Sequence, residues 1–87
     1  MMRLAEIALW TRGRLLGADA EVAGVAIDTR RLAVGDLFVA IKGERVDGHD
    51  FVAEAARRGA APAMITRKLD VELPQLVVDD PQLALGD

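Results

Sequence analysis

The segment 27–51 has residue types and a spacing that can form a binding site. An Asp-Thr-Arg triplet at 28–30 follows one apolar segment, and a donor-rich loop at 42–50 follows the apolar run 37–41. Two polar loops that flank one buried strand predict a shallow pocket at a sheet edge, because the strand fixes the positions of the loops. An acidic chain that gathers positive groups on these loops can hold an anionic ligand across that edge. The groups are Arg30, Arg31, Lys42, Arg45 and His49.

Each of these polar residues also has a structural explanation. Asp28 and Thr29 can close a turn at a strand end by bonding to their own backbone, and charged side chains in the second loop can simply be solvated. The single histidine, His49, lies between Asp47 and Asp50. That trio can indicate a metal or acid–base site, but it is more typical of a cap on the following helix. The sequence leaves open whether Asp47 and His49 contact a ligand or only cap that helix.

Composition excludes several classes of protein. The chain has 87 residues, a net charge of −3 and no cysteine. The acidic balance argues against a nucleic-acid partner, and the cysteine count removes disulfides, thiolate metal sites and cysteine nucleophiles. No Walker-type GxxxxGK[ST] loop is present, so no triphosphate is expected to bind in that manner. The first apolar run is too short for a signal peptide or a membrane span, so we expect a cytoplasmic protein with no membrane partner.

The hydrophobic pattern predicts a small single-domain α/β sandwich with a mixed, partly parallel sheet and two main helices. The first helix is expected at 3–11, with Gly13 as its left-handed cap and Trp10 over the edge of the core. The second begins its inner face at Phe51 and ends at Gly59. The strands on either side of this second helix should be parallel, as in a β-α-β unit. Strands are expected at 14–16, 22–27, 37–41, 62–66 and 76–78, with 37–41 as the central strand covered on both faces.

The last residues of the sequence predict the start of a further element. Two aspartates precede Pro81, which is a helix-start signal, and the sequence ends shortly afterwards at Asp87. We therefore expect residues 1–80 to form one domain and residues 81–87 to begin a helix or linker that leads to another domain of a longer protein.

Several segments, taken in order, resemble the amino-terminal domain of the Mur ligases. The KGER and DGHDF wording resembles the family member that adds D-alanyl-D-alanine to UDP-N-acetylmuramoyl-tripeptide more than the sister enzyme that adds the third peptide residue. None of the matching segments is catalytic. They are DTR at 28–30, GDLFVAIKGER at 35–45, DGHDF at 47–51, EAARRGAAPAMI at 54–65 and LPQLVVDDPQLALG at 73–86.

The resemblance implies a three-domain, ATP-dependent amide ligase of cytoplasmic peptidoglycan synthesis. In such an enzyme the first domain holds the UDP end of the sugar-peptide substrate. The other domains, absent from this chain, bind ATP with Mg²⁺ and receive D-alanyl-D-alanine. The family activates the peptide carboxylate as an acyl phosphate, which the amine then attacks. The 87-residue chain alone is therefore expected to bind substrate without catalysing the reaction.

The resemblance also implies which residues contact the UDP group. The first loop matches the family's contacts to uridine and diphosphate, and the second matches its contacts to uracil or ribose. A threonine hydroxyl can donate to a phosphate or ribose oxygen, and an arginine can form a charge-assisted, bidentate bond. The flat, neutral uracil is best recognised by backbone groups of the second loop. The candidates are Ile27, Thr29, Arg30, Glu44, Arg45, Val46, Asp47 and His49.

Other functions stay open at this level. The same domain of the sister ligase fits most of the matching segments, and a free-standing module could use the two polar loops to bind a protein. A hydrolase or metal enzyme would need a second histidine, or a nucleophile with a base, which the residue inventory does not supply.

Overall fold

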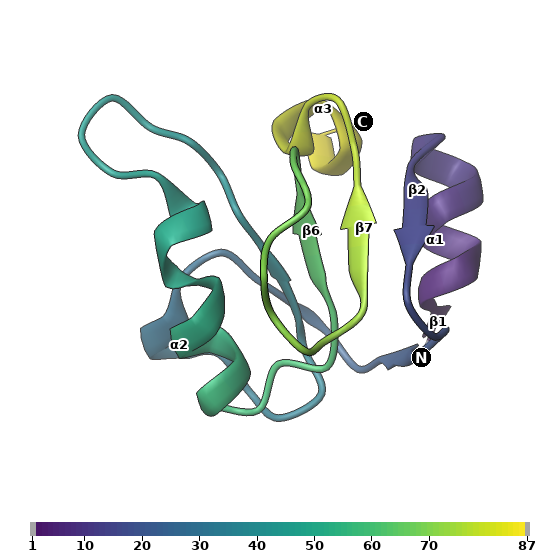
Figure 1. The fold of residues 1–87 in the computed structure, drawn as a ribbon, viewed down its shortest axis with the longest axis horizontal. Coiled ribbons are helices and arrows are strands. Elements are labelled where there is room, and N and C mark those ends of the chain that lie inside the picture. Colours follow the sequence, from purple (N-terminus) through teal and green to yellow (C-terminus); the bar gives the residue numbers. More distant parts are fainter. Residues whose placement is uncertain (1, 87) are drawn as a thin grey trace.

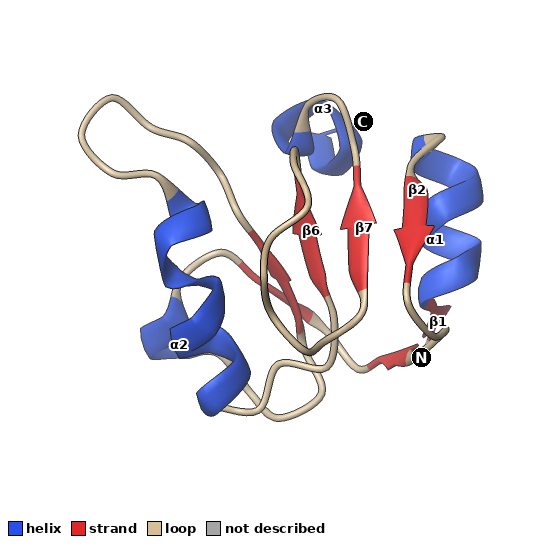
Figure 2. Ribbon diagram, in the orientation of Figure 1, coloured by secondary structure: helices blue, strands red, loops and turns tan. Residues whose placement is uncertain are grey.

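The computed structural model describes residues 2–86 (Figures 1 and 2). The helices are α1 (Leu4–Thr11), α2 (Val52–Arg57) and α3 (Pro81–Gly86). The strands are β1 (Met2–Arg3), β2 (Arg14–Leu16), β3 (Glu21–Val22), β4 (Val25–Ala26), β5 (Leu37–Val39), β6 (Ala63–Ile65) and β7 (Gln75–Val77). Short 3₁₀ helices lie at Thr29–Arg31 and Gly48–Phe51. Within the described range, no helix has the length and apolar character needed to cross a bilayer.

The main sheet has five strands in the order β2-β7-β6-β5-β4. Strands β4, β5, β6 and β7 are parallel to one another, and β2 is antiparallel to β7. Strands β1 and β3 form a separate antiparallel pair. The predicted mixed, partly parallel sheet is confirmed, as is the parallel arrangement of β5 and β6 around α2. The middle strand is β6, whereas the prediction assigned that position to β5, which lies one place nearer the edge.

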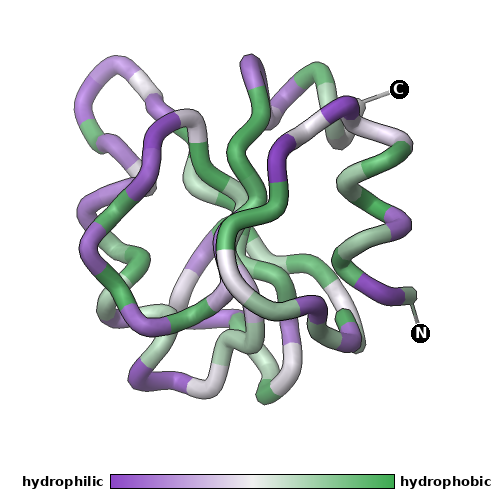
Figure 3. The backbone as a smooth tube through the Cα atoms, turned by 45° about the vertical axis from the view of Figure 1, so that its right-hand side comes forward, coloured by the Kyte–Doolittle hydropathy of each residue, from purple (hydrophilic) through white to green (hydrophobic). Residues whose placement is uncertain are grey.

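Helices cover both faces of the main sheet, which confirms the predicted sandwich. Side chains alternate along β5, so that Leu37 and Val39 pack in the cluster that includes α1, whereas Phe38 packs in the cluster beneath α2. Figure 1 shows α1 and α2 on opposite sides of the view, with β6 and β7 between them. In Figure 3 the loop that precedes α2 is mostly hydrophilic. Every residue of β5 is buried, as expected for a strand covered on both faces.

The prediction of one strand over residues 22–27 is wrong. Val22 pairs with Met2 in the small sheet, whereas Val25 pairs with Leu37 in the main sheet. The chain crosses between the two sheets at Gly24, where a Cβ atom would lie only 2.8 Å from Asp36 Oδ1. Two short strands form because the partners on the two sides of Gly24 belong to different sheets.

The end of α1 also differs from the prediction. Arg12, with φ 57°, adopts the left-handed conformation that the sequence assigned to Gly13. Gly13 is needed for space, because a Cβ atom there would lie 2.6 Å from Leu76 Cδ1 and 2.8 Å from the Val77 carbonyl oxygen. Trp10 is 73% exposed and does not cover the core. Its position places it outside the inner face of α1, which carries the buried Leu4 and the partly buried residues packed on the same cluster.

Helix α3 begins as predicted, with Pro81 as its first residue and Asp80 Oδ1 accepting the Gln82 backbone N–H at 3.0 Å. Ala84 packs against the cluster on the α1 side of the sheet. The first turn of α3 is therefore packed as part of the folded unit.

We predict that Gly13→Ala destabilises the domain. The added methyl group would overlap β7, and the backbone of this buried strand cannot move away to make room. The expected loss is about 1–3 kcal/mol in the free energy of unfolding, measured by urea denaturation. Gly43→Ala is the matched control, since its nearest contact would be 3.3 Å from Val46 O. A Gly13→Ala protein as stable as the control would contradict the close approach of the two segments.

Candidate functional site

A cavity of about 530 Å³ lies where the two polar loops meet. One wall follows β4, and the other follows β5. Because these strands are parallel neighbours, the segments that leave their carboxyl ends emerge at the same sheet edge, where open α/β sheets commonly bind ligands. The structure thus brings the two predicted loops together. The lining residues are Ile27, Asp28, Thr29, Arg30, Phe38, Ile41, Gly43, Val46, Gly48 and Phe51.

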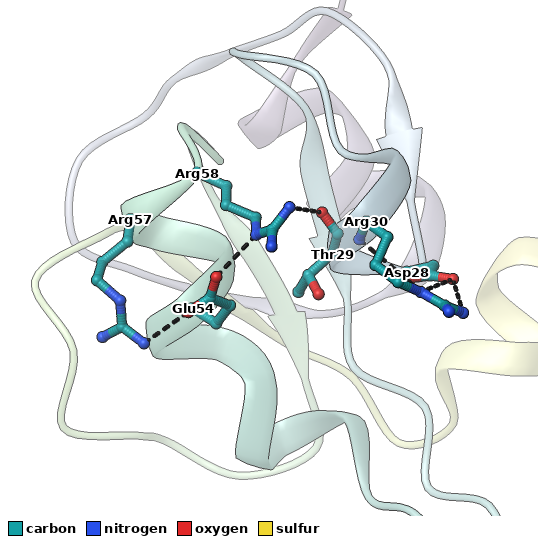
Figure 4. A network of polar contacts seen from close by, with 6 residues as sticks. All are labelled: Asp28, Thr29, Arg30, Glu54, Arg57 and Arg58. Carbon is teal, nitrogen blue, oxygen red and sulfur yellow. Dashed lines mark hydrogen bonds and ion pairs between the residues drawn. The ribbon is translucent and has the colours of Figure 1, made fainter.

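The first wall is a tight turn held by Asp28. Its Oδ1 accepts the Arg30 backbone N–H at 2.9 Å, which caps the 3₁₀ helix, and its Oδ2 lies 2.8 Å from Arg30 Nη2 (Figure 4). These bonds to Arg30 lower the pKa of Asp28 to about 2. The turn interpretation of the Asp-Thr-Arg triplet is therefore confirmed, and the same turn also lines the cavity.

Helix α2 holds the same turn from its other side. Arg58 Nη1 donates to the Thr29 carbonyl oxygen at 3.4 Å, and Arg58 Nε donates to Glu54 Oε2 at 2.7 Å (Figure 4). Glu54 Oε1 also accepts from Arg57 Nη2 at 2.8 Å. The bonds to Arg58 and Arg57 lower the pKa of Glu54. The cavity wall is thus connected to α2 by a contact between residues 29 positions apart, which local sequence patterns do not reveal.

The second wall is a hairpin between Ile41 and Gly48. Gly43 N–H donates to Val46 O at 2.7 Å, and Gly48 N–H donates to Ile41 O at 2.8 Å. Lys42 and Asp47 form an isolated antiparallel bridge between these two bonds. A Cβ atom at position 48 would lie 2.6 Å from the Ile41 nitrogen, so only glycine allows the two ends of the hairpin to approach this closely.

Asp47 and His49 lie at the base of the hairpin and bond to each other. Asp47 Oδ1 caps the 3₁₀ helix by accepting the His49 backbone N–H at 3.0 Å, and it lies 2.7 Å from His49 Nδ1. These two hydrogen bonds lower the pKa of Asp47, the backbone bond most. The His49 side chain is only 1% exposed. The geometry supports the capping interpretation of this pair over direct contact with a ligand.

The structure divides the candidate residues into two groups. Four line the cavity: Ile27, Thr29, Arg30 and Val46. The other four do not line it: Glu44 and Arg45 are exposed within the hairpin, and Asp47 and His49 support its base.

Sequence reasoning missed most of the apolar wall of the cavity. Phe51 was assigned to the inner face of α2, but it is 42% exposed and lines the cavity with Phe38 and Ile41. Its position directly after the polar loop was the available signal, since the first residue of a helix can face the preceding loop as well as the core. Phe38 and Ile41 could be assigned to the cavity wall only once the position of the sheet edge was known.

The arrangement can hold a ligand with a flat apolar part and a polar or anionic part. The lining includes the apolar residues Val46 and Phe51, and its residues Thr29 and Arg30 carry hydrogen-bond donors. Arg30 is 83% exposed, but its guanidinium already bonds to Asp28, so an anionic ligand would have to compete for it. Within residues 2–86, no three His, Asp or Glu side chains converge on a possible metal position.

A second cavity, of about 640 Å³, lies between α1 and α3 and includes Trp10 and Leu83 in its lining. It is larger, but it contains none of the residues that the sequence assigned to a binding site. The cavity at the β4 and β5 edge is therefore the better candidate for a specific polar ligand.

Comparisons with known proteins agree with the fold and the motifs. The sequence model of a family described as "Mur ligase family, catalytic domain" matches residues 21–83. UDP-N-acetylmuramoyl-tripeptide–D-alanyl-D-alanine ligase from Escherichia coli strain K12 is 51% identical over 75 residues, which cover 86% of this chain and 17% of that enzyme. UDP-N-acetylmuramoyl-L-alanyl-D-glutamate–2,6-diaminopimelate ligase from Geobacillus kaustophilus is 42% identical over 70 residues, or 80% of this chain and 14% of that enzyme.

Solved structures give the same result. A crystal structure of MurF from Acinetobacter baumannii superposes with a TM-score of 0.82 at 36% identity, over 94% of this chain and 19% of that one. MurF from Thermotoga maritima, in complex with ADP, gives a TM-score of 0.61 at 37% identity, over 66% of this chain and 13% of that one. The chain thus spans less than a fifth of the length of these relatives. The expected resemblance is confirmed, and the chain belongs to the Mur ligase family.

Proposed function

We propose that this chain is a substrate-binding domain that holds the UDP group of a sugar-peptide precursor in the cavity between the Thr29 turn and the Ile41–Gly48 hairpin. The observation that carries the proposal is that both loops line one cavity. The names of the relatives support the choice of ligand, because the ligases from E. coli and G. kaustophilus both act on UDP-N-acetylmuramoyl substrates.

The cavity offers complementary surfaces to the parts of UDP. Uracil fits the apolar wall, where Phe51 and Val46 can contact its face and backbone groups of the hairpin can bond to its edges. In this proposal Thr29 donates to a ribose or phosphate oxygen, and Arg30 supplies a positive charge for the diphosphate. Glu44 and Arg45 lie within the same hairpin. We propose that they contact UDP through their backbone groups rather than through their side chains.

At the level of the whole protein, we propose an ATP-dependent amide ligase of peptidoglycan synthesis that works in the cytoplasm. Residues 1–80 would hold the UDP end of the substrate, and residues 81–87 would lead toward a domain that binds ATP and Mg²⁺. The ADP complex of the T. maritima relative supports a nucleotide site outside this domain, since no Walker-type loop occurs in the chain. Alone, the chain would bind substrate without forming an amide bond.

We propose D-alanyl-D-alanine as the group added and UDP-N-acetylmuramoyl-tripeptide as the acceptor. The identity of 51% with the E. coli ligase, against 42% with the diaminopimelate-adding enzyme, supports this choice. UDP binding cannot distinguish the two reactions, because both substrates carry UDP. Assays of the full-length protein can do so, with tripeptide and D-alanyl-D-alanine in one reaction and dipeptide and diaminopimelate in the other. Activity in the second reaction alone would identify the sister ligase.

We predict that UDP shifts the amide resonances of residues 27–30 and 43–51 in a labelled sample of this chain. The affinity should be weak, with a Kd of roughly tens of micromolar to millimolar, because most substrate contacts lie elsewhere. Phe51→Ala should raise the Kd at least about fivefold, since an aromatic surface that contacts a base is removed.

Leu9→Ala is the matched control, because Leu9 is 80% exposed on α1 and lies outside the cavity lining. Its Kd for UDP should equal that of the unchanged chain. A spectrum that does not respond to UDP at millimolar concentration would refute the proposed ligand and favour the protein-interaction alternative.

We predict that Arg30→Ala raises the pKa of Asp28 from about 2 toward its ordinary value of 3.8. The ion pair is lost, but the backbone N–H at position 30 still donates, so the pKa should remain below 3.8. A folded-state pKa below the unfolded one stabilises the protein above about pH 4, and this contribution is lost as the pH falls toward 2. The stability of Arg30→Ala should therefore depend less on pH across that window. Carboxyl-carbon NMR titration measures the pKa.

The same titration tests the role of Arg30 in binding. Saturating UDP should raise the pKa of Asp28 in the unchanged chain, because the diphosphate draws Arg30 away and adds negative charge. Uridine, which has no phosphate, should leave the pKa at about 2. Equal titration curves with UDP and uridine would remove Arg30 from the diphosphate site.

A further inference from the structure

His49 is a buried side chain whose two ring nitrogens both have partners inside the protein. Nδ1 lies 2.7 Å from Asp47 Oδ1, and Nε2 accepts the Thr66 backbone N–H at 3.0 Å, with Thr66 Oγ1 at 3.2 Å. The backbone N–H of Thr66 can only donate, so Nε2 must offer its lone pair. The imidazole is therefore neutral, with its hydrogen on Nδ1 directed at Asp47.

Thr66 is the residue directly after β6, at the point where β6 no longer has a strand partner on this side. The pairing of β5 with β6 ends at Val39 and Met64, because the chain after β5 turns away into the hairpin. The His49 imidazole thus takes the place of a strand carbonyl as the acceptor of the Thr66 backbone N–H, in a hydrogen bond that is partly buried although Thr66 itself is exposed.

This bond also fixes the wall of the cavity. The hydrogen bonds at Gly43 and Gly48 close the hairpin on itself, but they do not attach it to β6. His49 follows Gly48 directly, and its Nε2 bonds to a residue 17 positions away at the end of a buried strand. Arg67 Nη1 approaches Asp47 Oδ2 at 3.7 Å on the same side. The hairpin base is therefore attached to β6 through the His49 ring.

We propose that His49 is a positioning residue for the UDP cavity, which it serves by attaching the hairpin to β6 without touching the ligand. This inference rests on the proposed function, because it assigns the attachment a role in UDP affinity. A hairpin that moves as one unit would displace Gly43, Val46 and Gly48 together, and these three residues form much of the second wall.

The test compares UDP affinity in three variants of this chain. His49→Phe keeps an aromatic ring at this position but removes its hydrogen bonds, and we expect its Kd for UDP to rise about tenfold. His49→Gln can still present an amide oxygen to the Thr66 N–H, and its Kd should stay within about threefold of the unchanged chain. Val22→Ala is the matched control, because Val22 is buried on the other side of the sheet and its truncation lowers stability without reaching the cavity.

All affinities are measured by NMR titration at a temperature where each variant is folded. If Val22→Ala weakens UDP binding as much as His49→Phe, or if His49→Phe binds as well as the unchanged chain, the positioning role is overturned while the proposed function stands. If the unchanged chain does not bind UDP, the proposed function is wrong and the positioning role falls with it.

The ring itself gives an independent measurement that needs no ligand. Imidazole ¹⁵N spectra should show a protonated Nδ1 and an unprotonated Nε2, and His49→Gln should retain the protection of the Thr66 amide against hydrogen exchange while His49→Phe loses it. A hydrogen on Nε2, or an unchanged Thr66 amide in His49→Phe, would overturn the proposed attachment.

Discussion

The parallel pairing of β4 with β5 is the constraint on which the candidate site depends. The register sets Val25 opposite Leu37 and Ala26 opposite Phe38, so the two strands end together and release their loops at one edge. A slip of one residue would exchange the faces of each strand. Phe38 would then leave both the cluster beneath α2 and the cavity. The cavity is thus a consequence of the strand register and of the covered faces that enforce it.

Much of the fold followed from local signals in the sequence. A continuous apolar run predicted β5, and two such runs around a helix predicted the parallel β5-α2-β6 unit. The errors arose where distant partners decide the local structure. Residues 22–27 form two strands because their partners belong to different sheets. Met2 pairs with Val22 before Gly24, and Leu37 pairs with Val25 after it. Arg12 takes the left-handed conformation, whereas Gly13 is needed for its small volume against β7.

The cavity could be located from the sequence, but its residues could not be assigned to roles. Polar loops after two strands indicated the edge at which the cavity lies, and the motifs named four residues that line it. The sequence could not separate lining from support. The partner of His49 lies 17 residues away, at the end of another strand, and the contact of Arg58 with the Thr29 turn spans 29 residues. Phe51 was ambiguous because an apolar residue at the start of a helix suits either the core or the preceding loop.

The charges of the candidate site suit the proposed role of holding a substrate better than a role in activating it. The cations at the first wall are already paired, Arg30 with Asp28 and Arg58 with Glu54, so little uncompensated charge faces the cavity. Under the proposed function, a diphosphate would therefore compete with a carboxylate for Arg30, and recognition would depend on shape and hydrogen bonds. Contacts made equally in the ground and transition states lower the KM without raising the kcat. Such a site suits a part of the substrate that remains chemically unchanged while the reaction proceeds elsewhere on the molecule.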